Sequence, residues 1–162
     1  MKVYLGIGSN QGDRRGNIQK ALEAIDALPA TLVEEVSSVI ETKPEGKWKE
    51  GERKGMFLNC CCRISTGLTP GRLLEELKGI ERAMGRRAPA SEGKACRRDS
   101  AREHTDRGYA GRKYTDRPID IDILLYGRRK IKTDSLQIPH PRMQERDFVM
   151  IPLQELLRGR VV

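Results

Sequence analysis

Two carboxylates interrupt an apolar segment in the last third of the chain. Residues 117–126 read RPIDIDILLY, so a single residue separates Asp120 from Asp122. Strand side chains alternate between two faces, and both acids would therefore project from one face, about 6 to 7 Å apart. Such a pair can hold Mg²⁺, which takes oxygen ligands and often joins carboxylates to substrate phosphates. The alternative is the solvated face of an edge strand, although Asp is depleted in strands and like charges on one face repel.

A second cluster follows at residues 138–148, which read IPHPRMQERDF. His140, Arg142 and Arg146 could donate hydrogen bonds to a phosphate and neutralise charge as it moves to a leaving group. The alternative is a proline-shaped loop with exposed charge. This cluster therefore indicates anion binding only in combination with the acidic pair.

Two further segments carry groups that could recognise a ligand. Phe57 and Asn59 lie two residues apart in an expected strand, so they would point together and offer an aromatic stack and an amide to a flat heterocycle. A buried aromatic and a capping amide are the alternative. Residues 8–12, GSNQG, resemble a phosphate loop but lack its Gly-Lys-Ser/Thr ending, and we attribute them to packing and turn geometry.

The elements that must position these residues follow from hydrophobic periodicity and turn signals. We expect strands at 3–8, 31–42, 56–64 and 118–126, helices at 18–28, 69–84 and 148–157, and a hairpin at 127–138. The order strand, helix, strand, strand, helix, strand predicts an α+β fold with a ferredoxin-like βαββαβ core. Its sheet would be mainly antiparallel with flanking helices. This layout supports many functions and selects none.

Length and composition limit the classes of protein. A chain of 162 residues with 37% hydrophobic and 33% charged residues suits one domain spanning 1–162. We expect no membrane association, because no apolar run reaches about 20 residues, and no secretory signal. The net charge of +8 attracts polyanions but does not distinguish ATP from nucleic acid.

The cysteines indicate a compartment. Cys60, Cys61 and Cys62 are consecutive and the fourth is Cys96, so neither a CxxC metal pair nor an evenly spaced disulfide framework can be drawn. We expect the consecutive cysteines to be small buried apolar residues of a strand, in a cytoplasmic protein.

Taken together, these segments resemble the 6-hydroxymethyl-7,8-dihydropterin pyrophosphokinase family over nearly the whole chain. The RxxDxDIL and PHPRMxER motifs are the most specific. The segments that carry the resemblance are GIGSN at 6–10, TKP at 42–44, FLN at 57–59, IE at 80–81, GR at 85–86, RPIDIDIL at 117–124, IPHPRM at 138–143 and ERDFVMIPL at 145–153.

The resemblance implies an ATP-dependent diphosphokinase of folate biosynthesis with two Mg²⁺ ions and ATP as co-substrate. Metal ligands would be Asp120 and Asp122, and catalysis would also involve Arg86 and Arg117. Nucleotide contacts would be Glu81, Arg86, Lys113, Arg117, His140 and Arg146. Pterin contacts would be Thr42, Pro44, Phe57, Asn59 and Phe148, with Phe57 standing where many members carry tyrosine.

One departure from the family is a basic insertion at about 86–116, longer than the usual connection. Lys113 matches a catalytic basic residue of the family loop by its distance from Arg117. We expect this loop and the loop at 46–55 to fold over both substrates.

The expected reaction moves pyrophosphate from ATP to the hydroxymethyl group of the pterin and releases AMP. The expected partners are these two substrates, with a monomeric protein and no nucleic acid. Two rival functions remain open from the residues alone. A nucleotidyltransferase would need its acids soon after Gly8 and Ser9, and an RNA-binding ferredoxin-like domain would need more aromatic residues than the 4% present.

Overall fold

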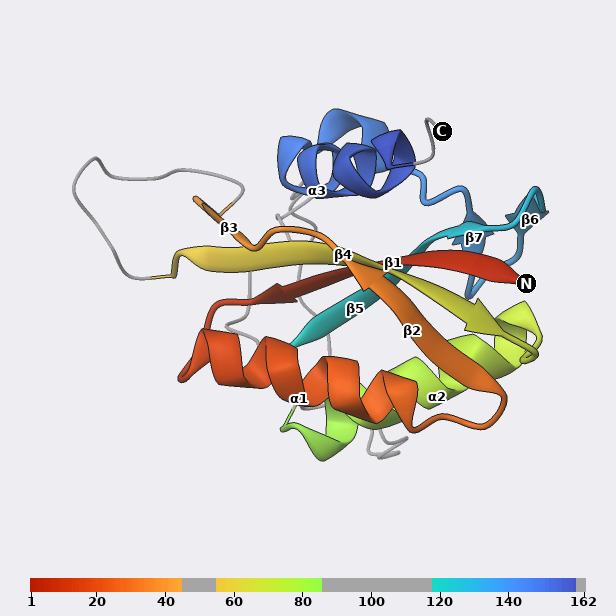
Figure 1. Cartoon of the computed structure of the whole chain (residues 1–162), viewed down its shortest axis with the longest axis horizontal. Coiled ribbons are helices and arrows are strands. Elements are labelled where there is room, and N and C mark those ends of the chain that lie inside the picture. The colour runs from red at the N-terminus through yellow and green to blue at the C-terminus, as the bar shows by residue number, and fades with distance from the viewer. Residues whose placement is uncertain (45–54, 86–117, 160–162) are drawn as a thin grey trace, which may run out of the picture.

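The main sheet has five strands, and every pairing within it is antiparallel (Figure 1). The computed structural model describes residues 1–44, 55–85 and 118–159. The strands are β1 (Lys2–Ser9), β2 (Thr31–Val36), β3 (Ile40–Thr42), β4 (Phe57–Thr66) and β5 (Asp120–Tyr126). Their order is β2-β4-β1-β5, with β3 paired to β4 beside β2, which confirms the expected ferredoxin-like α+β arrangement.

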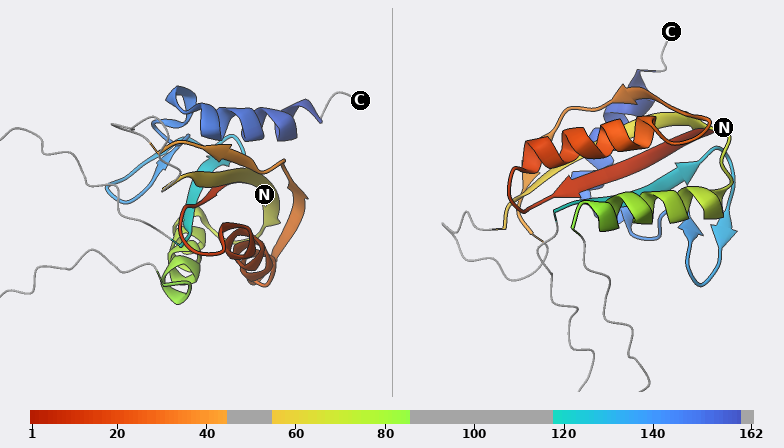
Figure 2. Two further views of the ribbon diagram at one scale, coloured as in Figure 1. Left: turned by 90° about the vertical axis from the view of Figure 1, so that its left-hand side faces the viewer. Right: turned by 90° about the horizontal axis from the view of Figure 1, so that it is seen from below.

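Helices cover the two faces of this sheet unequally. Helices α1 (Arg14–Asp26) and α2 (Pro70–Ala83) lie side by side on one face, and α3 (Asp147–Arg158) lies on the other (Figures 1 and 2). Each of these helices overlaps its predicted range. The predicted hairpin is also present, as strands β6 (Ile131–Lys132) and β7 (Gln137–Ile138), and a short 3₁₀ helix follows at Met143–Glu145.

Strand alternation divides the core into two clusters. On β4, Cys60 and Cys62 pack toward α1 and α2, while Cys61 packs with Tyr4 and Leu124 beneath α3. Burial raises the pKa of the Cys60 and Cys61 thiols to about 12. The three thiols are free and buried, so they behave as the small apolar residues that the sequence predicted.

The predicted continuous strand at 31–42 is wrong, because the structure divides it into β2 and β3. Val36 faces Cys62 of β4 whereas Ile40 faces Asn59, so four steps on one side match three on the other. Ser37 lies between them, donates its backbone N–H to the Cys61 carbonyl and accepts the Cys61 N–H through its hydroxyl oxygen. The hydroxyl group thus gives the Cys61 N–H an acceptor at the point where the extra residue interrupts the backbone hydrogen bonds between the strands.

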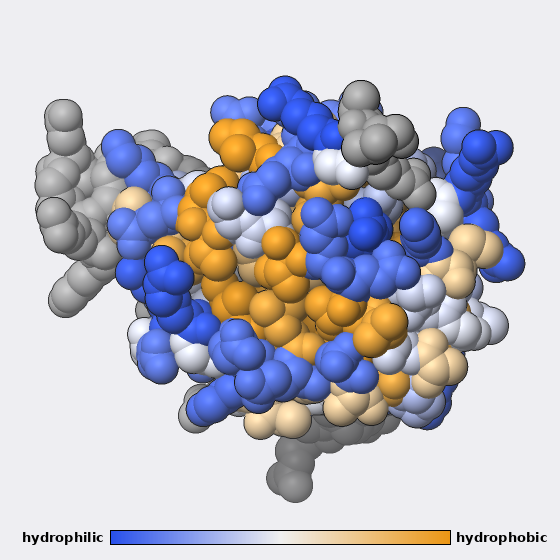
Figure 3. Space-filling model, viewed as in Figure 1, coloured by the Kyte–Doolittle hydropathy of each residue, from blue (hydrophilic) through white to orange (hydrophobic). Residues whose placement is uncertain are grey.

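Apolar side chains gather on one face of the molecule, over the sheet between α1 and α3 (Figure 3). Leu32 and Val36 of edge strand β2 are exposed. Between them in the sequence, Glu34 pairs with Arg63 of β4 at 2.8 Å, and Glu35 pairs with the same guanidinium at 2.9 Å. Charges of this kind protect an edge strand from pairing with another chain.

In the described ranges, no helix combines the length and hydropathy needed to cross a membrane.

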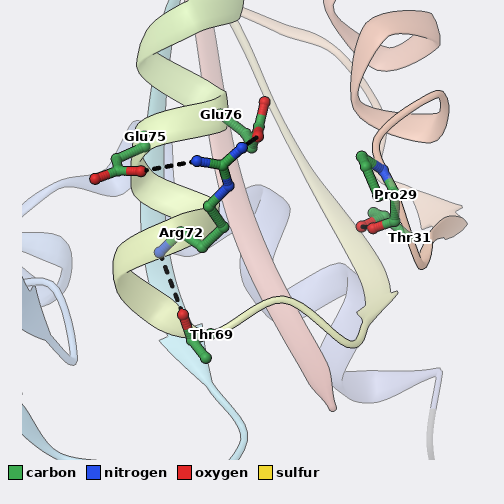
Figure 4. Close-up of polar contacts among 6 residues, drawn as sticks. All are labelled: Pro29, Thr31, Thr69, Arg72, Glu75 and Glu76. Carbon is green, nitrogen blue, oxygen red and sulfur yellow. Dashed lines mark hydrogen bonds and ion pairs between the residues drawn. The ribbon is translucent and has the colours of Figure 1, made fainter.

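Thr69 should stabilise the fold by capping α2. Its hydroxyl oxygen accepts the Arg72 backbone N–H, and the Arg72 side chain bridges Glu75 and Glu76 one turn further on (Figure 4). We expect Thr69→Ala to lower the free energy of unfolding by about 1 kcal/mol, because the first turn loses an acceptor. Urea denaturation measures this loss, and Thr69→Ser should retain most of the wild-type stability. Equal midpoints for the Ala variant and wild type would contradict the capping role.

Candidate active site

The site begins with a row of three residues across three neighbouring strands. In β1, Gly8 pairs with Asn59 of β4 on one side and with Asp120 of β5 on the other. Neighbouring strands are about 5 Å apart, so Asn59 and Asp120 are separated by about 10 Å across a residue that has no side chain. One step along the sheet, Gly6 pairs in the same way with Cys61 and Asp122.

Both aspartates project from the face of the sheet that carries α3. Ile121 and Ile123 are buried in the core on the other face, which α1 and α2 cover. Asp120 and Asp122, which alternate with these isoleucines, are partly exposed. Leu124 is buried beneath α3, and its side chain is 3.5 Å from where a Cβ on Gly6 would lie. The acids therefore lie on the same face, as alternation predicted, next to the point where the core under α3 ends.

Asn59 is held in one orientation beside Gly8. Its Nδ2 donates to the Thr42 hydroxyl at 2.7 Å, and the side chain is 7% exposed. A Cβ added to Gly8 would lie 2.8 Å from the Asn59 Oδ1 and 3.8 Å from the Phe57 ring. The amide oxygen thus lies over Gly8, and Phe57 lies next to it, so these two side chains point together as the sequence predicted.

Pro44 follows β3, two residues after Thr42. Its Cγ is 4.0 Å from where a Cβ on Gly55 would be, which brings the two ends of the segment 45–54 together. Arg14, at the start of α1, donates to the Met56 carbonyl at 2.8 Å and pairs with Glu41 of β3 at the same distance. These contacts tie β3, β4 and α1 together beside Phe57.

The segment after β7 supplies basic and aromatic side chains, and one of them, His140, is close enough to Asp120 to interact with its charge. The Arg146 guanidinium lies over the Phe148 ring, with its carbon 5.5 Å from the ring centroid. Phe148 stands in the first turn of α3 and packs against the core beneath that helix. His140 is tied to β5, because its backbone N–H donates to the Leu124 carbonyl at 3.0 Å.

The imidazole of His140 has a defined electrostatic environment. Burial lowers its pKa from 6.5, the charges of Arg146 and Arg142 lower it further, and Asp120 opposes them. The Arg142 backbone N–H donates to Nδ1 at 3.3 Å. A neutral imidazole that accepts at Nδ1 carries its proton on Nε2, so His140 can offer that N–H to an anion.

Glu81 comes from a different part of the fold than His140 and Arg146, the two other predicted nucleotide contacts that the structure describes. It belongs to α2, is 3% exposed, and its Oε1 accepts the Ile121 backbone N–H at 2.8 Å. The side chain thus reaches β5 from the face opposite to Asp120 and Asp122. Arg86, Lys113 and Arg117 lie outside the described residues, as do the proposed covering loops.

The turn after β1 is explained by local hydrogen bonds. The buried Ser9 hydroxyl donates to the Pro118 carbonyl at 2.5 Å, and the Asn17 amide nitrogen donates to Ser9 and to the Gln11 carbonyl. These bonds match the predicted packing and turn geometry, and they hold the start of β5 against the end of β1.

Comparison with known proteins identifies the family. The family model described as 7,8-dihydro-6-hydroxymethylpterin-pyrophosphokinase matches residues 4–158. The chain belongs to this family. Proteins named 2-amino-4-hydroxy-6-hydroxymethyldihydropteridine pyrophosphokinase from Aquifex aeolicus and Bacillus subtilis are each 36% identical over 154 residues, 95% of this chain. The alignments cover 79% and 77% of those proteins.

A relative with a second activity is similar over the same length. The protein named Folate synthesis bifunctional protein, mitochondrial, of Pisum sativum is 37% identical over 156 residues, which is 96% of this chain and 25% of that protein. The present chain is therefore a pyrophosphokinase of folate biosynthesis, an ATP-dependent enzyme that transfers a diphosphate group.

Magnesium, which the family resemblance implies, fits the side chains present. Asp120 and Asp122 offer oxygen ligands on one partly exposed face. Within 1–44, 55–85 and 118–159, no three His, Cys, Asp or Glu side chains are arranged to hold a metal ion. Mg²⁺ usually takes one or two carboxylates and completes its octahedron with water and phosphate oxygens, so two acids suffice when a triphosphate is present.

Gly8 is the site residue that sequence reasoning missed. We attributed it to turn geometry, yet it lies inside β1 and forms the floor between Asn59 and Asp120. A glycine inside a strand often marks a place where another group approaches the backbone closely. That signal was present in GIGSN, but only the register of three strands reveals which groups meet there.

The pKa of His140 should lie below 6.5 in the folded protein. As pH falls, the imidazole of the unfolded state therefore takes up its proton before that of the folded state. His140 then lowers the free energy of unfolding as pH drops through 6.5 toward the folded pKa, and it has no such effect at higher pH. An NMR titration of the imidazole, assigned with His140→Gln, measures the midpoint. Arg146→Ala should raise this pKa and Asp120→Asn should lower it. A midpoint at or above 6.5, or the same shift in both variants, would contradict this environment.

Proposed function

We propose that this end of the sheet transfers pyrophosphate from ATP to the hydroxymethyl group of 6-hydroxymethyl-7,8-dihydropterin. The observation that carries the proposal is the row in which Gly8 separates the Asn59 amide from the Asp120 carboxylate. A heterocycle-binding group and a metal-binding group then share one floor. The distance between them, about 10 Å, suits a flat bicyclic ring whose hydroxymethyl arm extends toward the phosphates.

The pterin would bind on the Asn59 side. Because Nδ2 of Asn59 donates to Thr42, its Oδ1 remains directed over Gly8 and can accept an N–H of the pterin edge. Phe57 is adjacent and partly exposed, and Phe148 approaches from α3, so the two rings could stack on the heterocycle. Thr42 and Pro44 would contribute backbone contacts around the ring.

The metal and ATP would bind on the β5 side. Asp120 and Asp122 would hold two Mg²⁺ ions, which would supply positive charge next to the ATP phosphates. His140 would donate Nε2–H to a phosphate oxygen, and Arg146 would neutralise phosphate charge. Arg86, Lys113 and Arg117 remain proposed phosphate or nucleotide contacts.

The reaction follows as an in-line displacement at the β-phosphorus. The hydroxymethyl oxygen forms the new bond, the bond between the β-phosphorus and the α–β bridging oxygen breaks, AMP leaves, and the hydroxyl proton is released. The bound ions would supply charge neutralisation on the phosphates. The residues of this chain orient both substrates and stabilise the charge that develops on AMP, which is the main requirement of such transfers.

The setting of the enzyme is also part of the proposal. One domain spanning residues 1–162 would work as a cytoplasmic monomer, without nucleic acid. Three buried free thiols suit a reducing compartment.

Asp120→Ala and Asp122→Ala should each lower pterin-dependent AMP release by at least about 10³-fold, because a metal ligand is lost where phosphate charge must be neutralised. The urea midpoint of both variants should equal or exceed that of the wild type, since removal of one acid relieves like-charge repulsion on the strand. Asp134→Ala, on the exposed hairpin loop, is the matched control and should retain full activity. Turnover within a few-fold of wild type for either strand variant would refute the assigned role.

Gly8→Ala should weaken pterin binding by about 10-fold or more. The new methyl group would lie 2.8 Å from Asn59 Oδ1, so the amide must leave the position in which it faces the ligand. The dissociation constant of the pterin, measured by calorimetry, reports this loss. Gly71→Ala is the matched control, because a Cβ at that helix position meets nothing within 4 Å. Unchanged pterin affinity in Gly8→Ala would show that Asn59 does not contact the ligand.

A further inference from the structure

Glu81 makes a contact that the reaction described above does not use. Its carboxyl group comes from the last turns of α2, which packs along β5 (Figure 2). Oε1 accepts the Ile121 N–H at 2.8 Å, in a place where Glu81 is almost fully buried. A carboxyl group is costly to bury, so a glutamate here needs a reason that an apolar residue would not satisfy.

The bond satisfies a donor at the open edge of the sheet. Among the strands of the described residues, β5 pairs only with β1, since it is last in the strand order. In an antiparallel ladder, alternate residues direct both backbone groups to the partner strand, and the residues between them direct both groups away. Glu81 binds the outward N–H of Ile121, which stands opposite Ile7 of β1.

Ile121 is also the residue between the two proposed metal ligands. Its side chain is buried in the core with α1 and α2, and its backbone N–H is held by Glu81. Ser9 holds the preceding Pro118 carbonyl from the β1 side. The backbone that carries Asp120 and Asp122 is therefore fixed at its start and at its centre, and both contacts come from groups outside β5.

We propose that Glu81 is a positioning residue for the metal site: it fixes the Ile121 backbone so that Asp120 and Asp122 present their carboxylates to a shared cation. This rests on the proposed function of the two acids. It differs from a direct nucleotide contact, which the family resemblance implied for Glu81. A ligand-contacting group would affect nucleotide binding without metal, whereas a positioning group affects chiefly the metal.

Three substitutions at position 81 separate these roles. Glu81→Met keeps the length of the side chain and removes the acceptor, Glu81→Asp keeps the carboxyl group but withdraws it by one methylene, and Glu81→Gln keeps an acceptor oxygen. Glu75→Ala is the matched control on the exposed side of α2. Mn²⁺ binding in the presence of a non-hydrolysable ATP analogue, followed by electron paramagnetic resonance, measures the metal site directly.

We expect Mn²⁺ affinity to fall about 10-fold or more in the Met and Asp variants and to stay within about 3-fold of wild type in the Gln variant. Amide exchange at Ile121 should accelerate in the first two variants and remain slow in the third. Affinity for the ATP analogue without divalent metal should be unchanged in all three. If the Met variant does not fold, the Asp variant alone provides the test.

The outcomes distinguish failure of this proposal from failure of the proposed function. Wild-type Mn²⁺ affinity in Asp120→Ala would overturn the metal assignment itself. Loss of Mn²⁺ in Asp120→Ala with full affinity in the Met and Asp variants at position 81 would overturn the positioning role alone. Equal loss of metal-free nucleotide binding in those two variants would assign Glu81 to the nucleotide instead. Weak metal binding in the Gln variant, with slow amide exchange at Ile121, would also overturn the positioning role, because a fixed backbone would then not be enough to form the metal site.

Discussion

The site depends on the open space that Gly8 leaves between side chains of two strands that are not neighbours. Strand β1 separates β4 from β5, and only a residue without a side chain lets groups from both share one space. A slip of one residue would move Asn59 or Asp120 to the other face of the sheet. Val3, Leu5 and Ile7, the core residues that alternate with this floor, prevent such a slip because they are buried against α1 and α2. Packing on one face of β1 thus sets the register that assembles the opposite face.

The unequal covering of the sheet explains why the chemistry occurs where it does. Helices α1 and α2 bury a continuous core, whereas the core beneath α3 is smaller and includes Cys61 and Leu124. The next residues outward on the same strands are Asn59 and Asp122. Polar groups therefore begin at the place where α3 no longer covers the strands. At the start of α3, the Arg146 guanidinium lies over the Phe148 ring.

Periodicity was sufficient to predict the fold and part of the site. Alternating isoleucines identified the face of Asp120 and Asp122, and the spacing of Phe57 and Asn59 identified theirs, because both depend only on the local pleat. The division at Ser37 could not be predicted, since it depends on a side-chain bond to Cys61 in another strand. Sequence reasoning placed Glu81 near the nucleotide only by resemblance, and its bond to Ile121 joins elements 40 residues apart. Contacts between distant elements were thus the information that local patterns lacked.

Among the described residues, acidic and basic groups at the site come from two different segments. The acids stand on β5, while Arg142 and Arg146 belong to the segment between β7 and α3. His140 interacts with both sides, since the charge of Arg146 lowers its pKa and the charge of Asp120 raises it. A free cation is attracted by the acids but repelled by the nearby guanidinium groups. A free triphosphate is attracted by the guanidinium groups but repelled by the acids. In the proposed function, a metal–triphosphate complex would satisfy both sides, because carboxylates suit the cation and guanidinium groups suit the phosphate oxygens. This division of charge would then favour the complex over either component, which is the selectivity that a metal-dependent transfer from ATP requires.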